Sequence, residues 1–221
     1  MAGLTSSTIG RKYAMALSAM FLLLFLIMHL SVNLISVFSP SAFNSASEFM
    51  GYNPLIQFLM QPILGFAVIF HFVMGFVLEL KNRSARPVKY AMNNGSANST
   101  WMSRNMIISG LVVLVFLGLH MYDFWWHEIN FKYVEANTPD NERFWHELHA
   151  KFADAWRVIF YIIAFVLLGL HLAHGFQSSF QSVGARHPKY TPVIKALGTW
   201  YSILIPAGFI IIALYHFLTQ S

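Results

Sequence analysis

Five long apolar runs constrain the fold of this 221-residue chain more than any other feature. A helix that crosses a membrane needs roughly 20 mostly apolar residues, and each run reaches that length. The runs lie at about 13–38, 55–80, 105–126, 153–178 and 197–218. They take up more than half of the chain, so we expect a single all-α domain over residues 1–221, an integral membrane bundle of five transmembrane helices.

The composition agrees with a membrane protein and excludes several other classes. Charged residues make up 10% of the chain, against about 25% in soluble domains. The chain has no cysteine, which excludes disulfides, iron–sulfur clusters held by this chain, thiolate zinc sites and covalently attached haem. The first apolar run is longer than the core of a signal peptide, and no small-residue cleavage site follows it. We therefore expect this run to remain in the mature protein.

The lysine and arginine residues predict the orientation, because they are enriched on the cytoplasmic side of membrane proteins. Ten would lie on one side: Arg11, Lys12, Lys81, Arg83, Arg86, Lys89, Arg104, Arg186, Lys189 and Lys195. Four would lie on the other: Lys132, Arg143, Lys151 and Arg157. We therefore expect a cytoplasmic N-terminus, an external C-terminus and a short external surface helix within 127–151. Because topology explains the positive charge, a nucleic acid partner is not expected.

Four histidines lie deep inside four different predicted spans: His29, His71, His120 and His171. Ionisable residues at membrane depth are costly and usually functional. From the rise of a helix, His29 and His120 both lie roughly 24 Å above the cytoplasmic ends of their spans. By the same rise, His71 lies about 15 Å up and His171 about 10 Å up. We therefore predict an outer pair (His29 and His120) and an inner pair (His71 and His171).

Two layers of paired imidazoles are what two stacked haems require. Each haem iron binds two axial nitrogens, one from each face of the haem ring. Without cysteine, both groups would be non-covalent haem b. Gly75 and Gly175 follow the inner-pair histidines by four residues, and a glycine one turn from a ligand leaves room for a macrocycle. The alternative explanation of each glycine is close helix packing.

The remaining histidines receive other interpretations. His174 shares a helix face with His171 and is an alternative ligand, but His171 is preferred because of its spacing to Gly175. His216 is expected at the membrane interface near the end of the last span. The others are expected to be mostly solvated, in loops or at the interface: His127, His146, His149 and His187.

The segments around the four span histidines resemble a known family. They read LFLIMHLSVNL around His29, FHFVMGF around His71, FLGLHMY around His120 and LHLAHGFQSSFQSVG around His171. With five spans and 42 residues from His29 to His71, the chain is similar to the single-chain, five-helix cytochrome b558 subunit of succinate:quinone oxidoreductases from Bacteroidetes-type bacteria. The resemblance covers essentially the whole chain, although the later intervals of 49 and 51 residues are longer than the first.

This resemblance implies a membrane anchor for a flavoprotein and an iron–sulfur protein on the cytoplasmic face of a bacterial inner membrane. Succinate would be oxidised at the partner's flavin, and electrons would pass through iron–sulfur clusters, the inner haem and the outer haem to menaquinone. The inner pair would ligate the inner haem and the outer pair the outer haem. The chain would carry the quinone site but no succinate site, so enzyme activity would belong to the assembly.

The direction of the reaction stays open, because some relatives of the family reduce fumarate. Several of those relatives carry a glutamate two residues before the fourth-helix ligand, where it serves a proton pathway. This chain has Gly169 at that position, which favours succinate oxidation.

A quinone site beside the outer haem needs a proton donor or acceptor and apolar or aromatic walls. The candidates are Glu48, Gln57, Trp125, Trp126, His127 and Asp154. Glu48 is the first choice, because it is an acid in an otherwise uncharged outer loop. Trp125 and Trp126 are also explained by the aromatic belt of membrane proteins.

Cations near the membrane edges could pair with haem propionates. The candidates are Arg11, Lys12, Arg83 and Arg104 for the inner haem and Arg157 for the outer haem. Each is also explained by topology or by snorkelling of a long side chain. The basic cytoplasmic connection, including YAMNNGSANST at 90–100, is the expected docking face for the partner subunits, although anionic lipid would suit it equally.

Two other functions compete with this interpretation. The first is a dihaem cytochrome b of another quinone-linked enzyme, such as a formate dehydrogenase or a hydrogenase, in which the ligands are usually arranged differently on the helices. The second is a haem-free transporter in which the span histidines relay protons. A transporter predicts acids inside the bundle near these histidines, whereas Glu79 and Asp123 are expected only at the ends of spans.

Overall fold

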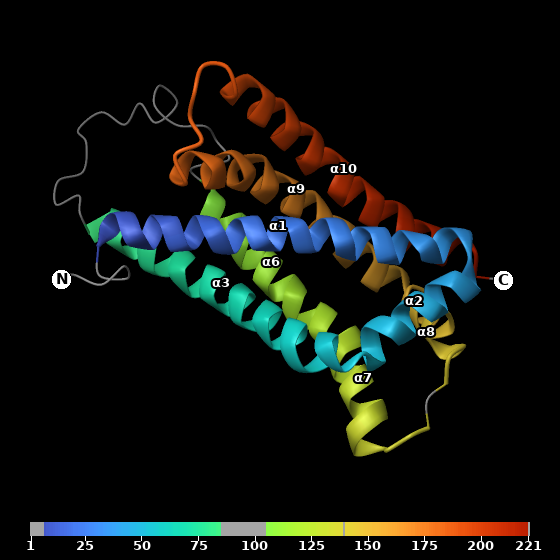
Figure 1. Cartoon of the computed structure of the whole chain (residues 1–221). Helices are drawn as coiled ribbons and strands as arrows, with labels where there is room; N and C mark the ends of the chain where they lie inside the picture. The colour runs from blue at the N-terminus through green and yellow to red at the C-terminus, as the bar shows by residue number, and fades with distance from the viewer. Residues whose placement is uncertain (1–6, 85–104, 139, 221) are drawn as a thin grey trace.

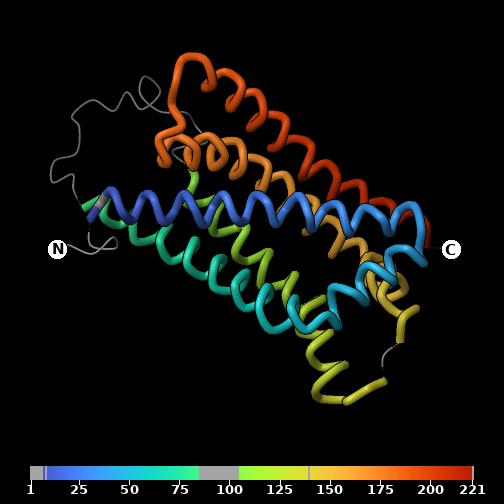
Figure 2. Tube along the Cα trace, viewed as in Figure 1, coloured from blue at the N-terminus to red at the C-terminus, as the bar shows by residue number. Residues whose placement is uncertain are grey.

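The computed structural model describes residues 7–84, 105–138 and 140–220, and this part of the chain is helical without any strand. Long helices lie side by side, and α1 begins at the end of the bundle opposite to the one where α10 ends (Figures 1 and 2). The elements are α1 (Thr8–Phe38), α2 (Pro40–Tyr52), η1 (Ile56–Met60), α3 (Gln61–Ser84), α6 (Met106–His120), η2 (Met121–Trp126), α7 (His127–Ile129), η3 (Asn130–Val134), α8 (Arg143–Lys151), α9 (Ala155–Ser182) and α10 (Thr191–Leu218).

Five helices are long and apolar enough to cross a membrane, which confirms the predicted all-α bundle of five transmembrane helices. Their bounds are Ile9–Phe38, Ile56–Ser84, Met106–Val134, Ala155–Ser182 and Thr191–Leu218. Parts of the basic connection between the second and third of these helices lie outside the described residues: Arg86, Lys89, Arg104 and the segment 90–100.

The third long helix extends beyond its predicted end. It continues from Met106 to Val134 through the π-helical segments η2 and η3, so the predicted surface helix within 127–151 is correct only for α8. The charges beyond the predicted end at residue 126 are paired, since Glu128 lies 2.5 Å from Lys132 and also contacts Arg143. Paired charges are much less costly to bury than isolated ones, and the helix therefore continues.

Helix α9 forms the centre of the bundle, where it packs against α1, α6 and α10. Tyr161, Ala164 and Leu172 on α9 are almost fully buried. Gly169 allows α10 to approach closely, because a Cβ at this position would lie 3.0 Å from the carbonyl oxygen of Ser202. Large apolar side chains on other helix faces are exposed, such as Phe66 on α3 at 69%, as expected for a bundle surrounded by lipid.

A sharp corner between α1 and α2 turns the chain across one end of the bundle (Figure 1). Ser39 ends α1 and caps α2, where its hydroxyl accepts a hydrogen bond from the Ala42 N–H at 3.2 Å, and Pro40 occupies the first position of α2. Asn44 then joins α2 to α8, because its Nδ2 donates to the Glu142 carbonyl and its Oδ1 accepts from the Trp145 N–H.

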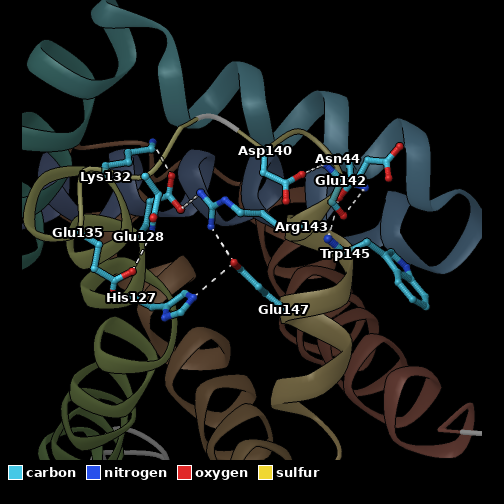
Figure 3. A network of polar contacts seen from close by, with 11 residues as sticks. Asn44, His127, Glu128, Lys132, Glu135, Asp140, Glu142, Arg143, Trp145 and Glu147 are labelled. Carbon is cyan, nitrogen blue, oxygen red and sulfur yellow. Dashed lines mark hydrogen bonds and ion pairs between the residues drawn. The ribbon is translucent and has the colours of Figure 1, made fainter.

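The same end of the bundle carries a group of ion pairs, which we call the loop network: His127, Glu128, Lys132, Arg143 and Glu147 (Figure 3). Arg143 is at its centre and contacts Glu128 through Nη2 and Glu147 through Nη1, the latter at 2.9 Å. Burial lowers the pKa of Arg143, but the hydrogen bonds and charges of the two glutamates outweigh burial and raise it. The network therefore fastens α8 to the extension of the third helix.

Replacing Arg143 with methionine should destabilise this end of the bundle. The Arg143 side chain is 6% exposed and its two glutamates are 23% and 29% exposed, so two partly buried carboxylates would each lose one partner and keep only Lys132 or His127. Breaking a buried pair costs about 3–5 kcal/mol, and partial exposure reduces this to about 2–3 kcal/mol. We expect the Tm in detergent to fall by about 5–10 °C.

The matched control is Arg83→Met, which removes an arginine from an exposed ion pair with Glu79. Exposed pairs of this kind contribute less than about 1 kcal/mol, so its Tm should change little. Equal effects of the two substitutions would contradict a stabilising role of the loop network.

Candidate functional site

The inner pair lies where α3 and α9 face each other. The ring centres of His71 and His171 are 6.5 Å apart, and the ring planes are close to perpendicular. Both side chains are only partly covered by protein, although they come from the middle of spans. Of the two candidate ligands on α9, the ring of His171 contacts the ring of His71. His174 lies one turn further along the same helix.

Two serines fix the orientation of the inner-pair rings. Ser18 Oγ on α1 lies 3.2 Å from Nδ1 of His71, and Ser109 Oγ on α6 lies 3.3 Å from Nδ1 of His171. Each hydroxyl donates its only proton to a carbonyl oxygen one turn earlier in its own helix, at 2.8 and 2.9 Å. With its proton on that carbonyl, each serine is placed to accept a hydrogen bond from a protonated Nδ1. This leaves the opposite nitrogen, Nε2, unprotonated and able to bind a metal.

The outer pair brings together one ring from α1 and one from α6, and the ring centres of His29 and His120 are 5.6 Å apart. A phenylalanine one turn earlier stacks on each ring: Phe25 on His29 at 5.2 Å and Phe116 on His120 at 5.6 Å. Asn33 lies 3.4 Å from Nδ1 of His29 through its side-chain nitrogen. Nδ1 of His120 is buried without a hydrogen-bond partner among the described residues.

Both pairs fit ligation of one metal ion between two imidazoles. Metal–nitrogen bonds to imidazole are about 2 Å long, which places the two ring centres about 6 Å apart, close to the separations in both pairs. The glycines at the inner pair leave flexible neighbours: a Cβ at Gly75 would lie 3.6 Å from the end of Met15, and one at Gly175 would lie 3.5 Å from the end of Met106. The donor set and these adaptable walls are suitable for a bis-histidine haem.

The geometry reveals an internal repeat in the sequence. The helices α1 and α6 share a methionine, a serine three residues later and a histidine eleven residues after the serine: Met15, Ser18 and His29 in α1, and Met106, Ser109 and His120 in α6. The helices α3 and α9 share the spacing from histidine to glycine. The chain therefore contains two halves, α1 with α3 and α6 with α9, and each histidine pair takes one ring from each half. This repeat is the sequence signal that could have identified the two serines.

A buried acid lies next to the outer pair. Asp123 in η2 is fully buried, accepts a hydrogen bond from the Tyr161 hydroxyl at 3.0 Å and pairs with Arg157 at 3.2 Å. The ring of Tyr161 in turn lies 6.3 Å from that of His120. Asp123 was expected at the end of a span, but the helix that carries it continues to Val134, and its side chain is buried within the protein.

The predicted quinone residues occupy different places at the same end of the bundle. Gln57 in η1 donates a hydrogen bond to the Gly51 carbonyl, and His127 lies 3.4 Å from Glu147 in the loop network. Trp125 and Trp126 are about half exposed, at 47% and 52%. Glu48 lies on α2 and is partly exposed, and Asp154 pairs with Arg157 at 2.7 Å.

His216, which was expected at the membrane interface, lies in the last turn of α10 and is fully buried within the protein. Its Nε2 lies 2.9 Å from Ser36 Oγ, and its Nδ1 lies 3.1 Å from Nδ1 of His149 on α8. Trp145 stacks on His149 with ring centres 4.5 Å apart. His149 is therefore part of the contact between α8, α1 and α10, which the sequence did not predict because it depends on how the loop folds back.

Comparison of the chain with protein-family models, with curated proteins and with solved structures finds no match in any of the three.

The contact between His149 and His216 should make stability depend on pH. Burial and the nearby His146 lower the pKa of His149, so the folded protein binds fewer protons than the unfolded chain. Stability is then complete above the ordinary histidine pKa of about 6.5 and falls as the pH drops below it. We expect the Tm to fall by a few degrees between about pH 7.5 and pH 5, and less steeply in His149→Gln. Equal slopes in both proteins would contradict this role of His149.

Proposed function

We propose that this chain is a dihaem cytochrome b that anchors a succinate:quinone oxidoreductase in the membrane and transfers electrons to a quinone. The observation that carries the proposal is the presence of two histidine pairs, each from two different spans and each with a ring separation that suits one metal ion. A lone membrane histidine is adequately explained by a hydrogen bond between helices. Two matched pairs at two depths are not.

The residues of the chain supply position, orientation and an apolar environment. A bound haem b supplies one-electron redox chemistry. His71 and His171 would hold the inner haem, with Ser18 and Ser109 fixing their tautomers. His29 and His120 would hold the outer haem, with Phe25 and Phe116 against their rings, and Gly75 and Gly175 would leave space beside the inner haem.

The partners and the location belong to the same proposal and rest on the family resemblance. The chain would bind a flavoprotein and an iron–sulfur protein on the cytoplasmic side of a bacterial inner membrane and reduce menaquinone at the opposite end. Succinate would react only on the partner, so the chain would act as an electron-transfer subunit. The alternative, a dihaem subunit of a formate dehydrogenase or hydrogenase, is less favoured, because those subunits usually arrange their ligands differently on the helices.

A second function, haem-free proton transport, is favoured by Asp123. A proton relay requires an acid near the span histidines, and Asp123 is buried and linked through Tyr161 to the outer pair. The inner pair has serines rather than acids as neighbours, which gives the relay no continuation. Haem content separates the two functions directly.

Replacing one histidine should remove one haem and spare the other. His71→Ala and His171→Ala should each lose the inner haem, whereas His29→Ala and His120→Ala should each lose the outer haem, because a bis-histidine site needs both rings. The measurement is a reduced-minus-oxidised spectrum with a pyridine haemochromogen count. The native chain should contain two haems b.

His187→Ala, in the exposed turn between α9 and α10, is the control and should retain both haems. Loss of both haems in a folded single variant would contradict the pairing. Absence of haem from the native, folded protein would overturn the cytochrome proposal and leave the proton relay as the better explanation.

The serines at the inner pair should tune only the inner haem. Ser18→Ala and Ser109→Ala each remove the acceptor for an Nδ1–H, which makes the imidazole a weaker donor to the iron and disfavours the oxidised state. The inner midpoint potential should rise by about 20–60 mV, from the net value of one hydrogen bond. Redox titration followed by optical spectra measures this shift.

The matched control is Ser31→Ala, because Ser31 is an exposed serine of α1 that donates to a backbone carbonyl and contacts no histidine ring. Its potentials should equal the native ones. An unchanged inner potential in both Ser18→Ala and Ser109→Ala would refute the orienting role of these hydroxyls.

A further inference from the structure

Asp123 has an unused hydrogen-bond acceptor deep inside the protein. Its Oδ2 accepts from the Tyr161 hydroxyl and pairs with Arg157, whereas its Oδ1 is buried with no hydrogen-bond partner in the described part of the chain. Buried polar atoms without partners are rare in folded proteins. Such an acceptor therefore points to a ligand or a water molecule that donates a hydrogen bond to it.

The acid lies between the outer pair and the exposed end of the bundle. On one side, the Tyr161 ring contacts that of His120. On the other side, Arg157 pairs with Asp154, and the exposed fractions of the three charged side chains rise from 0% at Asp123 to 14% at Arg157 and 55% at Asp154. A small molecule bound at Asp123 would thus be close to the outer pair and near the polar surface.

The internal repeat separates this acid from the residues that hold the histidines. At the position of Asp123, the first half of the repeat has Val32, and at the position of Arg157 it has Gln57. The first half nevertheless supplies its histidine to the outer pair as the second half does. The acid and its arginine are therefore not part of the arrangement that the two halves share.

The chemistry of the free oxygen selects the ligand. A carboxylate paired with an arginine only accepts hydrogen bonds, so the ligand must carry a donor. Haem propionates and the carbonyl groups of an oxidised quinone are acceptors and do not fit, whereas the hydroxyl group of a quinol is a donor. We propose that Asp123 binds a quinol hydroxyl through Oδ1, and that the site therefore holds the quinol more tightly than the quinone.

This inference rests on the proposed quinone-linked function and deepens it. Tighter binding of the reduced form raises the potential of the bound two-electron couple, by about 30 mV for each tenfold preference. Reduction of the quinone at this end of the protein would become more favourable as a result. Asp123 would thus bias the direction of electron flow through its binding preference.

The experiment compares the affinities of the full-length chain for a short-chain 1,4-naphthoquinone and for its quinol, by anaerobic calorimetry in detergent. The native protein should bind the quinol roughly tenfold more tightly, from the value of a hydrogen bond to a charged group. Asp123→Asn should bind both forms equally within about twofold, because an amide donates as well as accepts. Glu79→Gln is the matched control, since Glu79 is also an acid paired with an arginine near the end of a span, and it should keep the native preference.

Equal affinities in the native protein, failure to bind either form, or a preserved preference in Asp123→Asn would each overturn the inference. The comparison in the native protein requires no substitution, so it decides the matter even if Asp123→Asn does not fold. The haem content of the same samples tests the electron-transfer proposal separately. Haem without a quinol preference refutes only the role of Asp123, whereas a quinol preference without haem refutes only the cytochrome.

Discussion

The four imidazoles inside an apolar bundle are the constraint on which the rest of the structure depends. A polar ring in a hydrocarbon environment is costly unless it has partners, so each ring has to meet another helix at the correct depth. Rings from α1 and α6 meet at the outer pair, and rings from α3 and α9 meet at the inner pair. These two requirements fix the relative positions of four helices. Helix α10 contributes no histidine to either pair and packs against α9.

The internal repeat shows that one arrangement is used twice. In each half, the first helix provides an outer-pair histidine and a serine. The second helix provides an inner-pair histidine, and the serine lies within hydrogen-bond distance of its ring. Because each pair combines one ring from each half, neither half can form a two-ligand site alone. The site therefore exists only when both halves pack together, which couples formation of the site to formation of the fold.

The sequence predicts some of these features and not others, for identifiable physical reasons. Hydropathy predicts the five spans, and helix rise predicts which histidines share a depth, because both depend only on local spacing. The burial of Asp123 and His216 depends on polar partners far along the chain, such as Arg157 for Asp123 and His149 for His216. The serines at the inner pair were missed for a different reason: their role becomes visible only when the two halves are compared at matching positions.

The two halves diverge beyond the outer pair, where the loop network and α8 cover the bundle (Figure 3). These elements bury several polar groups at this end of the bundle. The polar partners of each group indicate whether its role is structural. The terminal nitrogens of Arg143 contact two carboxylates, and both ring nitrogens of His216 have polar neighbours, which is sufficient for structural roles. Asp123 differs in its place, because it is fully buried beside the outer pair, where one of its oxygens has a partner and the other has none among the described residues. This oxygen is therefore the position at which we expect a donor from outside the chain.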